Sequence, residues 1–158
     1  MLDPQQFREY IVRPTLQYMG LWSAAAENLV VGTAIQESGL RYVDQLSPGP
    51  GPAYGIYQME RATYEDLLRW VQREKPALAG RLEALKGVWP TGVEQLTSNL
   101  AYGAAMCRVH YLRALGDQPL PGPSDINGLA KIWKRSYNTY KGKGRPEQFV
   151  RSYMAAHQ

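Results

Sequence analysis

The fold of this chain is decided by two segments, AAAENLVVGTAIQESGL over residues 24–40 and YGIYQM over residues 54–59. Small and aliphatic side chains recur in the first segment at the intervals of a helix. Ser23 is a suitable N-cap, and Gly39 suits the left-handed position that follows a helix C-terminus. The segment predicts an apolar helix that ends on a lone carboxylate, Glu37. A loop rich in proline and glycine then leads to the second segment.

Apolar residues keep helical spacing along most of the remaining chain. No segment alternates apolar and polar residues as a half-buried strand does. The predicted fold class is therefore all-α, with a minor irregular hairpin near Tyr54, in one domain. The predicted helices cover residues 4–19 (interrupted at Pro14), 63–75, 77–85, 93–115, 126–137 and 146–156.

Composition and charge argue against several classes of protein. No apolar run approaches the roughly 20 residues of a membrane span, and the N-terminus lacks the basic and then apolar segments of a signal peptide, so we expect neither. Cys107 is the single cysteine, and with His110 and His157 it is too little for a zinc site, so we expect no metal and no cofactor. The formal charge of +4 suits an anionic partner, either nucleic acid or a cell wall.

The position of Glu37 predicts a raised pKa. Partial burial disfavours the carboxylate anion, and the negative end of the helix dipole disfavours it further. A carboxyl group whose pKa lies near neutrality can serve as a general acid. The alternative is a solvent-facing glutamate in the last turn of a helix.

Three short motifs resemble those of the lysozyme-like lytic transglycosylases and goose-type lysozymes. QESG at 36–39 resembles the first motif of that family, GIYQM at 55–59 the second, and SYNT at 136–139 the third. The small-residue helix NLAYGA at 99–104 has the expected character as well, and GPAYGIYQME at 51–60 is similar to lysozyme-like proteins of tailed bacteriophages. The resemblance implies a lysozyme-like helical domain with a substrate cleft.

This resemblance also divides the chain. It covers the sequence from Ser23 to Tyr153. We therefore expect one domain over residues 1–158, with a catalytic core at 23–153 and a helical N-terminal extension at 1–20.

The resemblance implies a role for Glu37 and for the residue that follows it. Glu37 would protonate the glycosidic oxygen between N-acetylmuramic acid and N-acetylglucosamine. In a transglycosylase the same carboxylate then removes the proton of the muramoyl 6-hydroxyl, which closes a 1,6-anhydro ring without water. Ser38 would orient Glu37 or the acetamido group of the substrate, or its hydroxyl would simply bond to the backbone of the helix.

The second and third motifs imply substrate-binding roles. Gln58 would hydrogen-bond the substrate, and Gly55 would allow a close approach of the backbone. Tyr137 would position Glu37 through its hydroxyl, or would be a core aromatic residue. Asn138 would bind sugar or brace its loop.

Several further residues complete the implied cleft. Met59 belongs to the second motif, and Tyr54, Tyr57 and Tyr102 could stack on sugar faces, although some of these aromatic residues would serve packing. The chain departs from the family pattern where Tyr57 replaces a methionine and Ser136 an alanine. Those changes leave the mechanism possible.

A second carboxylate would separate two reaction types. Retaining glycosidases place it at about 5–5.5 Å and inverting ones at roughly 6.5–9.5 Å from the first. The candidates are Asp44, after the first motif, and Glu60, directly after the second. Asp44 could instead cap a loop, and Glu60 could start a helix, so both a lysozyme and a transglycosylase remain open.

The resemblance leads to an expected biological setting. We expect a peptidoglycan-degrading component of a phage virion, in the tail or ejected with the genome, which binds glycan strands and other virion proteins. An endolysin in the host cytoplasm before release is the nearest alternative, and an inactive structural virion protein is an alternative of another class. Nucleic-acid binding is a weaker interpretation, based on the basic cluster from Lys131 to Arg145.

Overall fold

The computed structural model describes residues 1–44 and 52–158. Within them, one antiparallel pair of two-residue strands joins β1 (Ala53–Tyr54) to β2 (Met59–Glu60). All other regular elements are helical, so the all-α class and the minor hairpin at Tyr54 are confirmed for the described residues. The helices are α1 (Pro4–Phe7), the π-helical η1 (Arg8–Val12), α2 (Arg13–Met19), α3 (Ala24–Ser38), α4 (Arg61–Glu74), α5 (Pro76–Leu85), the 3₁₀ turn η2 (Gly92–Glu94), α6 (Gln95–Ser98), α7 (Leu100–Leu115), α8 (Ile126–Trp133), the π-helical η3 (Lys134–Asn138) and α9 (Pro146–Ala156).

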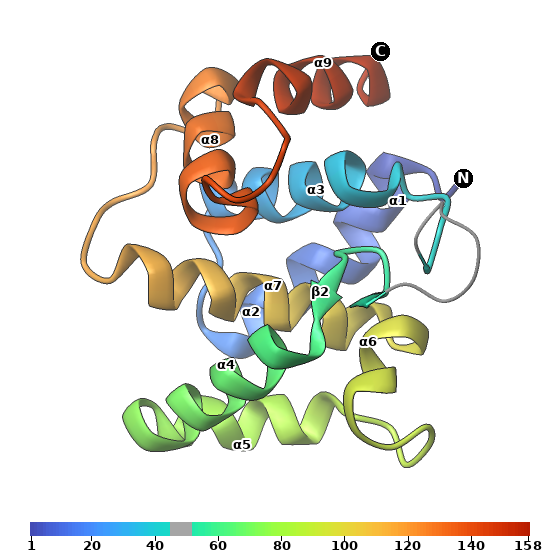
Figure 1. Ribbon diagram of the computed structural model, residues 1–158, viewed down its shortest axis with the longest axis vertical. Helices are drawn as coiled ribbons and strands as arrows, with labels where there is room; N and C mark the ends of the chain where they lie inside the picture. The colour runs from blue at the N-terminus through green and yellow to red at the C-terminus, as the bar shows by residue number, and fades with distance from the viewer. Residues whose placement is uncertain (45–51) are drawn as a thin grey trace.

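Two apolar helices, α3 and α7, form the centre of the fold. Most of their side chains are buried, as expected of helices that are apolar all round. Figure 1 shows α8 and α9 at one end of the molecule and α4 and α5 at the other, with α3 and α7 between them. Helix α3 contacts α8 and α9, while α7 contacts α4, α5 and α6. The two central helices therefore join the two ends of the domain.

Polar side chains cap the central helices. The Ser23 hydroxyl accepts a backbone N–H bond of 3.0 Å in the first turn of α3, and Gly39 ends this helix with a φ of 64°. Asn99 caps α7 in the same way, through an N–H bond of 3.0 Å. The prediction of one helix over 93–115 is wrong, because the Asn99 side chain replaces backbone partners there and separates α6 from α7.

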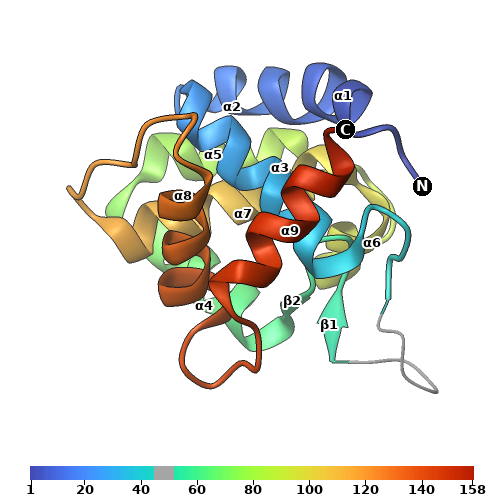
Figure 2. The same ribbon diagram turned by 90° about the horizontal axis from the view of Figure 1, so that it is seen from above.

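Residues 1–20 are built into the core. The side chains of Phe7, Leu16 and Met19 are at most 3% exposed and belong to the same buried cluster as those of α3 and α7. Helix α2 contacts α5 and α7, and η1 contacts α3 and α7. Figure 2 shows α1 and α2 running along one side of the domain. They form a layer that packs against the central helices and shares their buried core.

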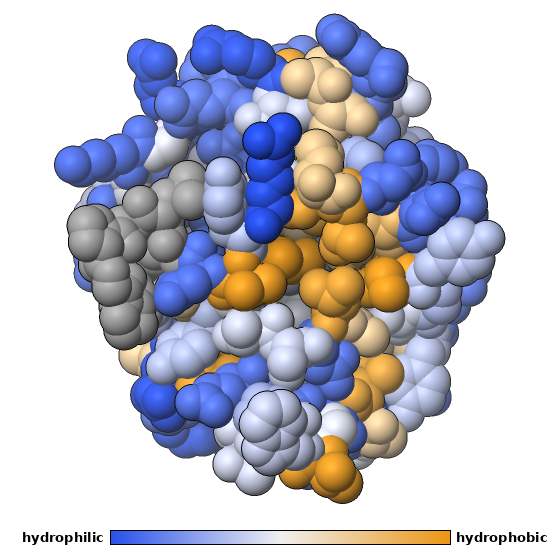
Figure 3. Space-filling view, turned by 90° about the vertical axis from the view of Figure 1, so that its right-hand side faces the viewer, coloured by the Kyte–Doolittle hydropathy of each residue, from blue (hydrophilic) through white to orange (hydrophobic). Residues whose placement is uncertain are grey.

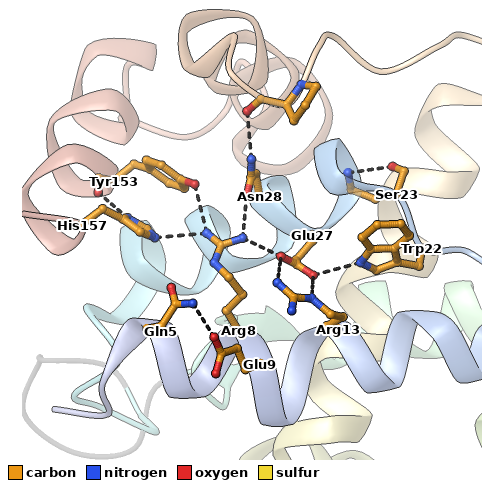
Figure 4. A network of polar contacts seen from close by, with 12 residues as sticks. Gln5, Arg8, Glu9, Arg13, Trp22, Ser23, Glu27, Asn28, Tyr153 and His157 are labelled. Atoms are coloured by element: carbon orange, nitrogen blue, oxygen red, sulfur yellow. Dashed lines mark hydrogen bonds and ion pairs between the residues drawn. The ribbon is translucent and has the colours of Figure 1, made fainter.

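A buried carboxylate, Glu27, connects this layer to the start of α3 (Figure 4). Arg8 donates to its Oε2 at 2.9 Å, Arg13 donates to both carboxylate oxygens at 2.7 and 3.0 Å, and Trp22 Nε1 donates to Oε1 at 2.9 Å. Burial alone would raise the pKa of Glu27, but the bonds from Arg13, Trp22 and Arg8 outweigh it and lower the pKa to about 2. Glu27 is therefore a fully satisfied buried anion.

The same network reaches the C-terminal helix. Arg8 Nη2 donates to the Tyr153 hydroxyl at 3.0 Å and contacts His157 Nε2 at 3.1 Å, and Arg8 Nη1 also donates to Asn28. These contacts join η1, which carries Arg8, to α3 and α9 (Figure 4). Arg8 thus joins the N-terminal layer to the last helix.

The surface is mixed in polarity. On the face drawn in Figure 3, hydrophobic side chains gather in a central patch that hydrophilic side chains surround. Large exposed apolar side chains also occur in turns, such as Trp89 at 82% and Tyr140 at 88% exposure. Among the described residues, no helix has both the length and the apolar character needed to cross a membrane.

Candidate active site

Glu37 lies in the last turn of α3, at one side of a cleft of about 520 Å³. The cleft is bounded by α3, by the start of α4, by the end of α7 and by the segment that follows η3. Elements from both ends of the domain therefore meet at this carboxyl group. The other lining residues are Gln58, Met59, Glu60, Thr63, His110, Arg113, Tyr137, Asn138, Thr139, Lys141 and Gly142.

A second cavity, of about 530 Å³, adjoins Glu37 as well. It shares Glu37 and Gln58 with the first cavity, so these two residues line both. The two cavities therefore adjoin at these two residues, and we refer to the two adjoining cavities together as the groove. The second cavity is also lined by Ile35, Gln36, Ser38, Gly39, Arg41, Tyr42 and Asp44.

The environment of Glu37 favours its protonated form. Burial raises the pKa of Glu37 to about 7. A hydrogen bond of 3.1 Å from Trp133 Nε1 to Glu37 Oε2 lowers this pKa, but its effect is smaller than that of burial. No arginine or lysine of the described residues forms an ion pair with it. The raised pKa expected from the end of an apolar helix is confirmed, with burial as its main cause.

The turn of the second motif places Gln58 beside Glu37. Gln58 Nε2 donates to the Gly55 carbonyl at 2.8 Å, which leaves its Oε1 as an acceptor. Gly55 has a φ of 75°, and a Cβ atom there would lie 2.1 Å from the Leu96 carbonyl oxygen. This glycine is required for packing against α6. The close approach expected for a ligand is made instead by the protein's own backbone.

Strained backbone is concentrated around the groove. Among the described residues, the non-glycine positions with positive φ are Leu40 (57°), Gln58 (51°) and Thr139 (64°). Gln58 and Thr139 line the cleft, and Leu40 follows the helix that carries Glu37. Such conformations cost on the order of 1–3 kcal/mol each and cluster at functional sites. Their position supports the groove as the site of function.

The third motif holds the second motif. Tyr137 Oη donates to the Tyr57 carbonyl at 2.6 Å, and its ring lies 4.7 Å from His110 and 5.5 Å from Tyr111 between centroids. The single phenolic proton is therefore directed to the Tyr57 carbonyl, and the role of Tyr137 in positioning Glu37 stays a prediction. Trp133 donates the hydrogen bond that Glu37 accepts.

Asn138 braces its loop. Its Oδ1 accepts a 2.7 Å hydrogen bond from Lys134 Nζ, which also donates to the Gly142 carbonyl at 3.0 Å. Asn138 and Gly142 both line the cleft. Of the two roles predicted for Asn138, the structure shows the bracing role.

Burial corrects the predicted stacking residues. Tyr57 and Tyr102 are 2% and 0% exposed, so neither can stack on a ligand, and the Tyr102 hydroxyl pairs with that of Tyr64 at 2.7 Å. Tyr54 is half-buried and lines a separate cavity of about 420 Å³. Met59 is buried beneath the cleft and contributes to its lining. Three of these four side chains therefore serve mainly the core.

Ser38 and the two candidate carboxylates occupy different parts of the groove. Ser38 Oγ donates to the Ala34 carbonyl at 3.0 Å. Of the two roles predicted for Ser38, the structure therefore shows the bond to the backbone of its own helix. Glu60 lines the first cavity, and Asp44 lines the second. Glu60 also directly precedes α4, without a side-chain capping bond. The two carboxylates thus line different cavities, each of which Glu37 also lines, and both stay open as partners.

Sequence reasoning missed three residues of the site: Trp133, which contacts Glu37, and His110 and Arg113, which line the cleft. Trp133 lies four residues before Tyr137, so helical spacing alone could have placed both on one face. His110 is neutral near pH 7, since burial and then the charge of Arg113 lower its pKa to about 4. Its Nδ1 is buried with no hydrogen-bond partner among the described residues. Neither His110 nor Arg113 belongs to a recognisable motif.

The groove contains a group that can exchange a proton near neutral pH, Glu37. Within the described part of the chain, no group of three histidine, cysteine, aspartate or glutamate side chains could hold a metal ion. Glu37 offers a carboxyl proton, and Gln58 offers an amide beside it.

Comparison of the chain with protein-family models, with curated proteins and with solved structures found no match.

Proposed function

We propose that the protein cleaves the β-1,4 glycosidic bond between N-acetylmuramic acid and N-acetylglucosamine in peptidoglycan, with Glu37 as the general acid. The observation that carries this proposal is a carboxyl group with a pKa of about 7 that lines two adjoining cavities. A glycan chain laid along the groove would place one sugar on each side of that carboxyl group. The resemblance of the three sequence motifs to lytic transglycosylases and goose-type lysozymes supports the same substrate.

The proposed reaction starts from protonated Glu37. The carboxyl group donates its proton to the glycosidic oxygen as the bond to the muramoyl C1 breaks, and the resulting carboxylate then acts as a base. Trp133 holds Oε2 in place, and the free Oε1 of Gln58 is an acceptor for a substrate hydroxyl or amide N–H. The strained backbone at Gln58 and Thr139 shapes the walls around this carboxyl group.

Two fates of the muramoyl cation define two candidate enzymes. In a lytic transglycosylase, Glu37 removes the proton of the 6-hydroxyl and a 1,6-anhydro ring forms. In a lysozyme, a second carboxylate assists attack by water. Glu60 and Asp44 each line a cavity that Glu37 also lines, so we keep the lysozyme as the second candidate. We propose the transglycosylase because Glu37 alone could perform both proton transfers.

The biological setting is proposed from sequence similarity. The run at 51–60 is similar to lysozyme-like proteins of tailed phages, which supports a virion component that opens the cell wall during genome entry. An endolysin is the second candidate. An inactive structural virion protein is a third, and it is disfavoured by a carboxyl group with a raised pKa in an open groove.

The test is incubation of the purified protein with peptidoglycan, followed by mass analysis of the released muropeptides. Anhydromuramoyl ends would identify a transglycosylase, and reducing ends a lysozyme. Glu37→Gln should lower the rate by about 10²–10⁴-fold, the usual contribution of a general acid. Glu60→Gln and Asp44→Asn are matched controls. A transglycosylase should stay active in both variants, whereas a lysozyme should lose activity in the variant that lacks its second carboxylate.

Two results would contradict the proposal. No release by the wild-type protein would reject an enzyme that acts on this substrate. Undiminished release by folded Glu37→Gln would reject the assignment of the general acid.

A further inference from the structure

Two cations line the cavity that holds Glu37. Arg113 lies in the last turn of α7, and Lys141 lies in the segment after η3. Among the described residues, neither is within ion-pair distance of a carboxylate. Lys141 Nζ lies 6.0 Å from the centre of the Tyr140 ring, which is itself exposed. Both cations therefore keep hydrogen-bond donors available to a ligand.

Arg113 differs from its neighbour on the same helix. Arg108 is also half-buried, but its Nε donates to the Leu21 carbonyl at 3.1 Å. Arg113 is half-buried at the cleft, and its guanidinium makes no hydrogen bond within the described part of the chain. A guanidinium has five N–H donors in a fork that matches a carboxylate. A partly desolvated guanidinium without a protein partner favours an anionic ligand.

The other charges of the cavity leave it cationic. His110 is uncharged near neutral pH, and Glu37 is largely protonated below pH 7. Glu60 is then the one anionic side chain among the described lining residues, and it is exposed. Arg113 and Lys141 outnumber it, so the field in the cavity attracts anions.

A third cation, Lys134, lies next to two of the lining residues and adds to this field. Lys134 bonds to the side chain of Asn138 and to the carbonyl of Gly142. Both of these acceptors line the cavity. The segment after η3 is thus held by one lysine and presents another to the cleft.

We propose that Arg113 and Lys141 form a subsite for a carboxylate that the substrate carries beside the bond to be cleaved. This inference rests on the proposed function and names the feature of the glycan that the cleft recognises. N-acetylglucosamine has no carboxylate, whereas the lactyl group of N-acetylmuramic acid has one, either free or replaced by those of an attached peptide. Because Arg113 and Glu37 line one cavity, the carboxylate belongs to the sugar next to the cleaved bond. The protein should therefore distinguish peptidoglycan from neutral chitin-type chains.

Calorimetric binding on a Glu37→Gln background tests this subsite without turnover. The ligands are neutral N-acetylglucosamine hexamers, soluble peptidoglycan strands with peptides, and the same strands after an amidase has removed the peptides. Arg113→Gln and Lys141→Gln should each weaken binding of carboxylate-bearing strands about tenfold, as for loss of one charged hydrogen bond. Binding of the neutral hexamer should not change.

The control is Lys143→Gln, because Lys143 is an exposed lysine of the same segment that does not line the cavity. It should leave binding of all three ligands unchanged. Dependence on Arg113 that appears only after amidase treatment assigns the carboxylate to the lactyl group, and dependence that disappears after the treatment assigns it to the peptide. Circular dichroism confirms that each variant is folded.

Other outcomes overturn the inference. They are equal weakening for the neutral hexamer, no weakening for any strand, or the same loss in Lys143→Gln. Muropeptide release by the wild-type protein, measured in parallel, separates the two proposals. Cleavage with no role for Arg113 leaves the proposed function standing and rejects the subsite. Carboxylate binding that depends on Arg113, without cleavage, supports the subsite and rejects the enzyme.

Discussion

Replacement of Glu37 by glutamine should make the protein more stable, by an amount that depends on pH. Burial raises the pKa of Glu37 to about 7, from a value of 4.5 in an exposed chain. Between these pH values the folded protein keeps a proton that the unfolded chain has lost. The free energy of unfolding therefore falls as pH rises, and the whole penalty is present above pH 7.

The size of the effect follows from the two pKa values. The interval from 4.5 to about 7, at about 1.4 kcal/mol per pKa unit, corresponds to about 3 kcal/mol. Glutamine carries no charge at any of these pH values, and its carbonyl can still accept the hydrogen bond from Trp133. We expect Glu37→Gln to match the wild type at pH 4 and to exceed its stability by about 3 kcal/mol at pH 8.

Urea unfolding of both proteins at intervals from pH 4 to pH 8 measures this difference, since other titrating groups cancel between them. Glu65→Gln is a suitable control, because Glu65 is exposed and only weakly paired with Arg61 at 3.9 Å. Its stability should follow that of the wild type at every pH. A difference between Glu37→Gln and the wild type that does not change with pH would refute the reasoning. So would a glutamine variant that is less stable at pH 8.

Three further changes test other parts of the structure. Trp133→Phe removes the donor to Glu37, so the pKa of Glu37 should rise and the pH profile of muropeptide release should shift to higher pH; an unchanged profile would contradict this. Gly55→Ala should destabilise the fold by about 3 kcal/mol or more in urea unfolding, because of its φ of 75° and the carbonyl that would meet its Cβ; a loss below about 1 kcal/mol would contradict it. Arg8→Met should lower the free energy of unfolding by about 3–5 kcal/mol in the same measurement, because it leaves the buried anion Glu27 less well paired. This loss of stability should shrink as pH falls from 4.5 towards 2, because Glu27 is then protonated.

Local patterns predicted the local features of this protein. Ser23 and Gly39 bound α3 as expected, because capping depends on a few neighbouring residues. The raised pKa of Glu37 could also be inferred, since an apolar helix implies burial near its end. The helical spacing that defined the all-α class is likewise a property of short windows.

Tertiary contacts account for what could not be predicted. Tyrosine suits both a buried core and a ligand platform, so only packing shows that Tyr57 and Tyr102 are buried. The expected motifs offered the Tyr137 hydroxyl two acceptors, Glu37 and the Tyr57 carbonyl. It donates to the Tyr57 carbonyl because of how α7 and η3 pack, which the local sequence does not show. The contact between Trp133 and Glu37 joins residues 96 positions apart, which no window of sequence contains.

The network around Arg8 has a consequence for the order in which the chain folds during synthesis. Arg8 and Glu27 leave the ribosome early and can pair at once, but Tyr153 follows Arg8 by 145 residues. Phe149 of α9 also packs directly over Gly32, in the middle of α3. A nascent chain that lacks α9 therefore exposes one side of α3. The helix that bears Glu37 obtains its last neighbour only when α9 has emerged.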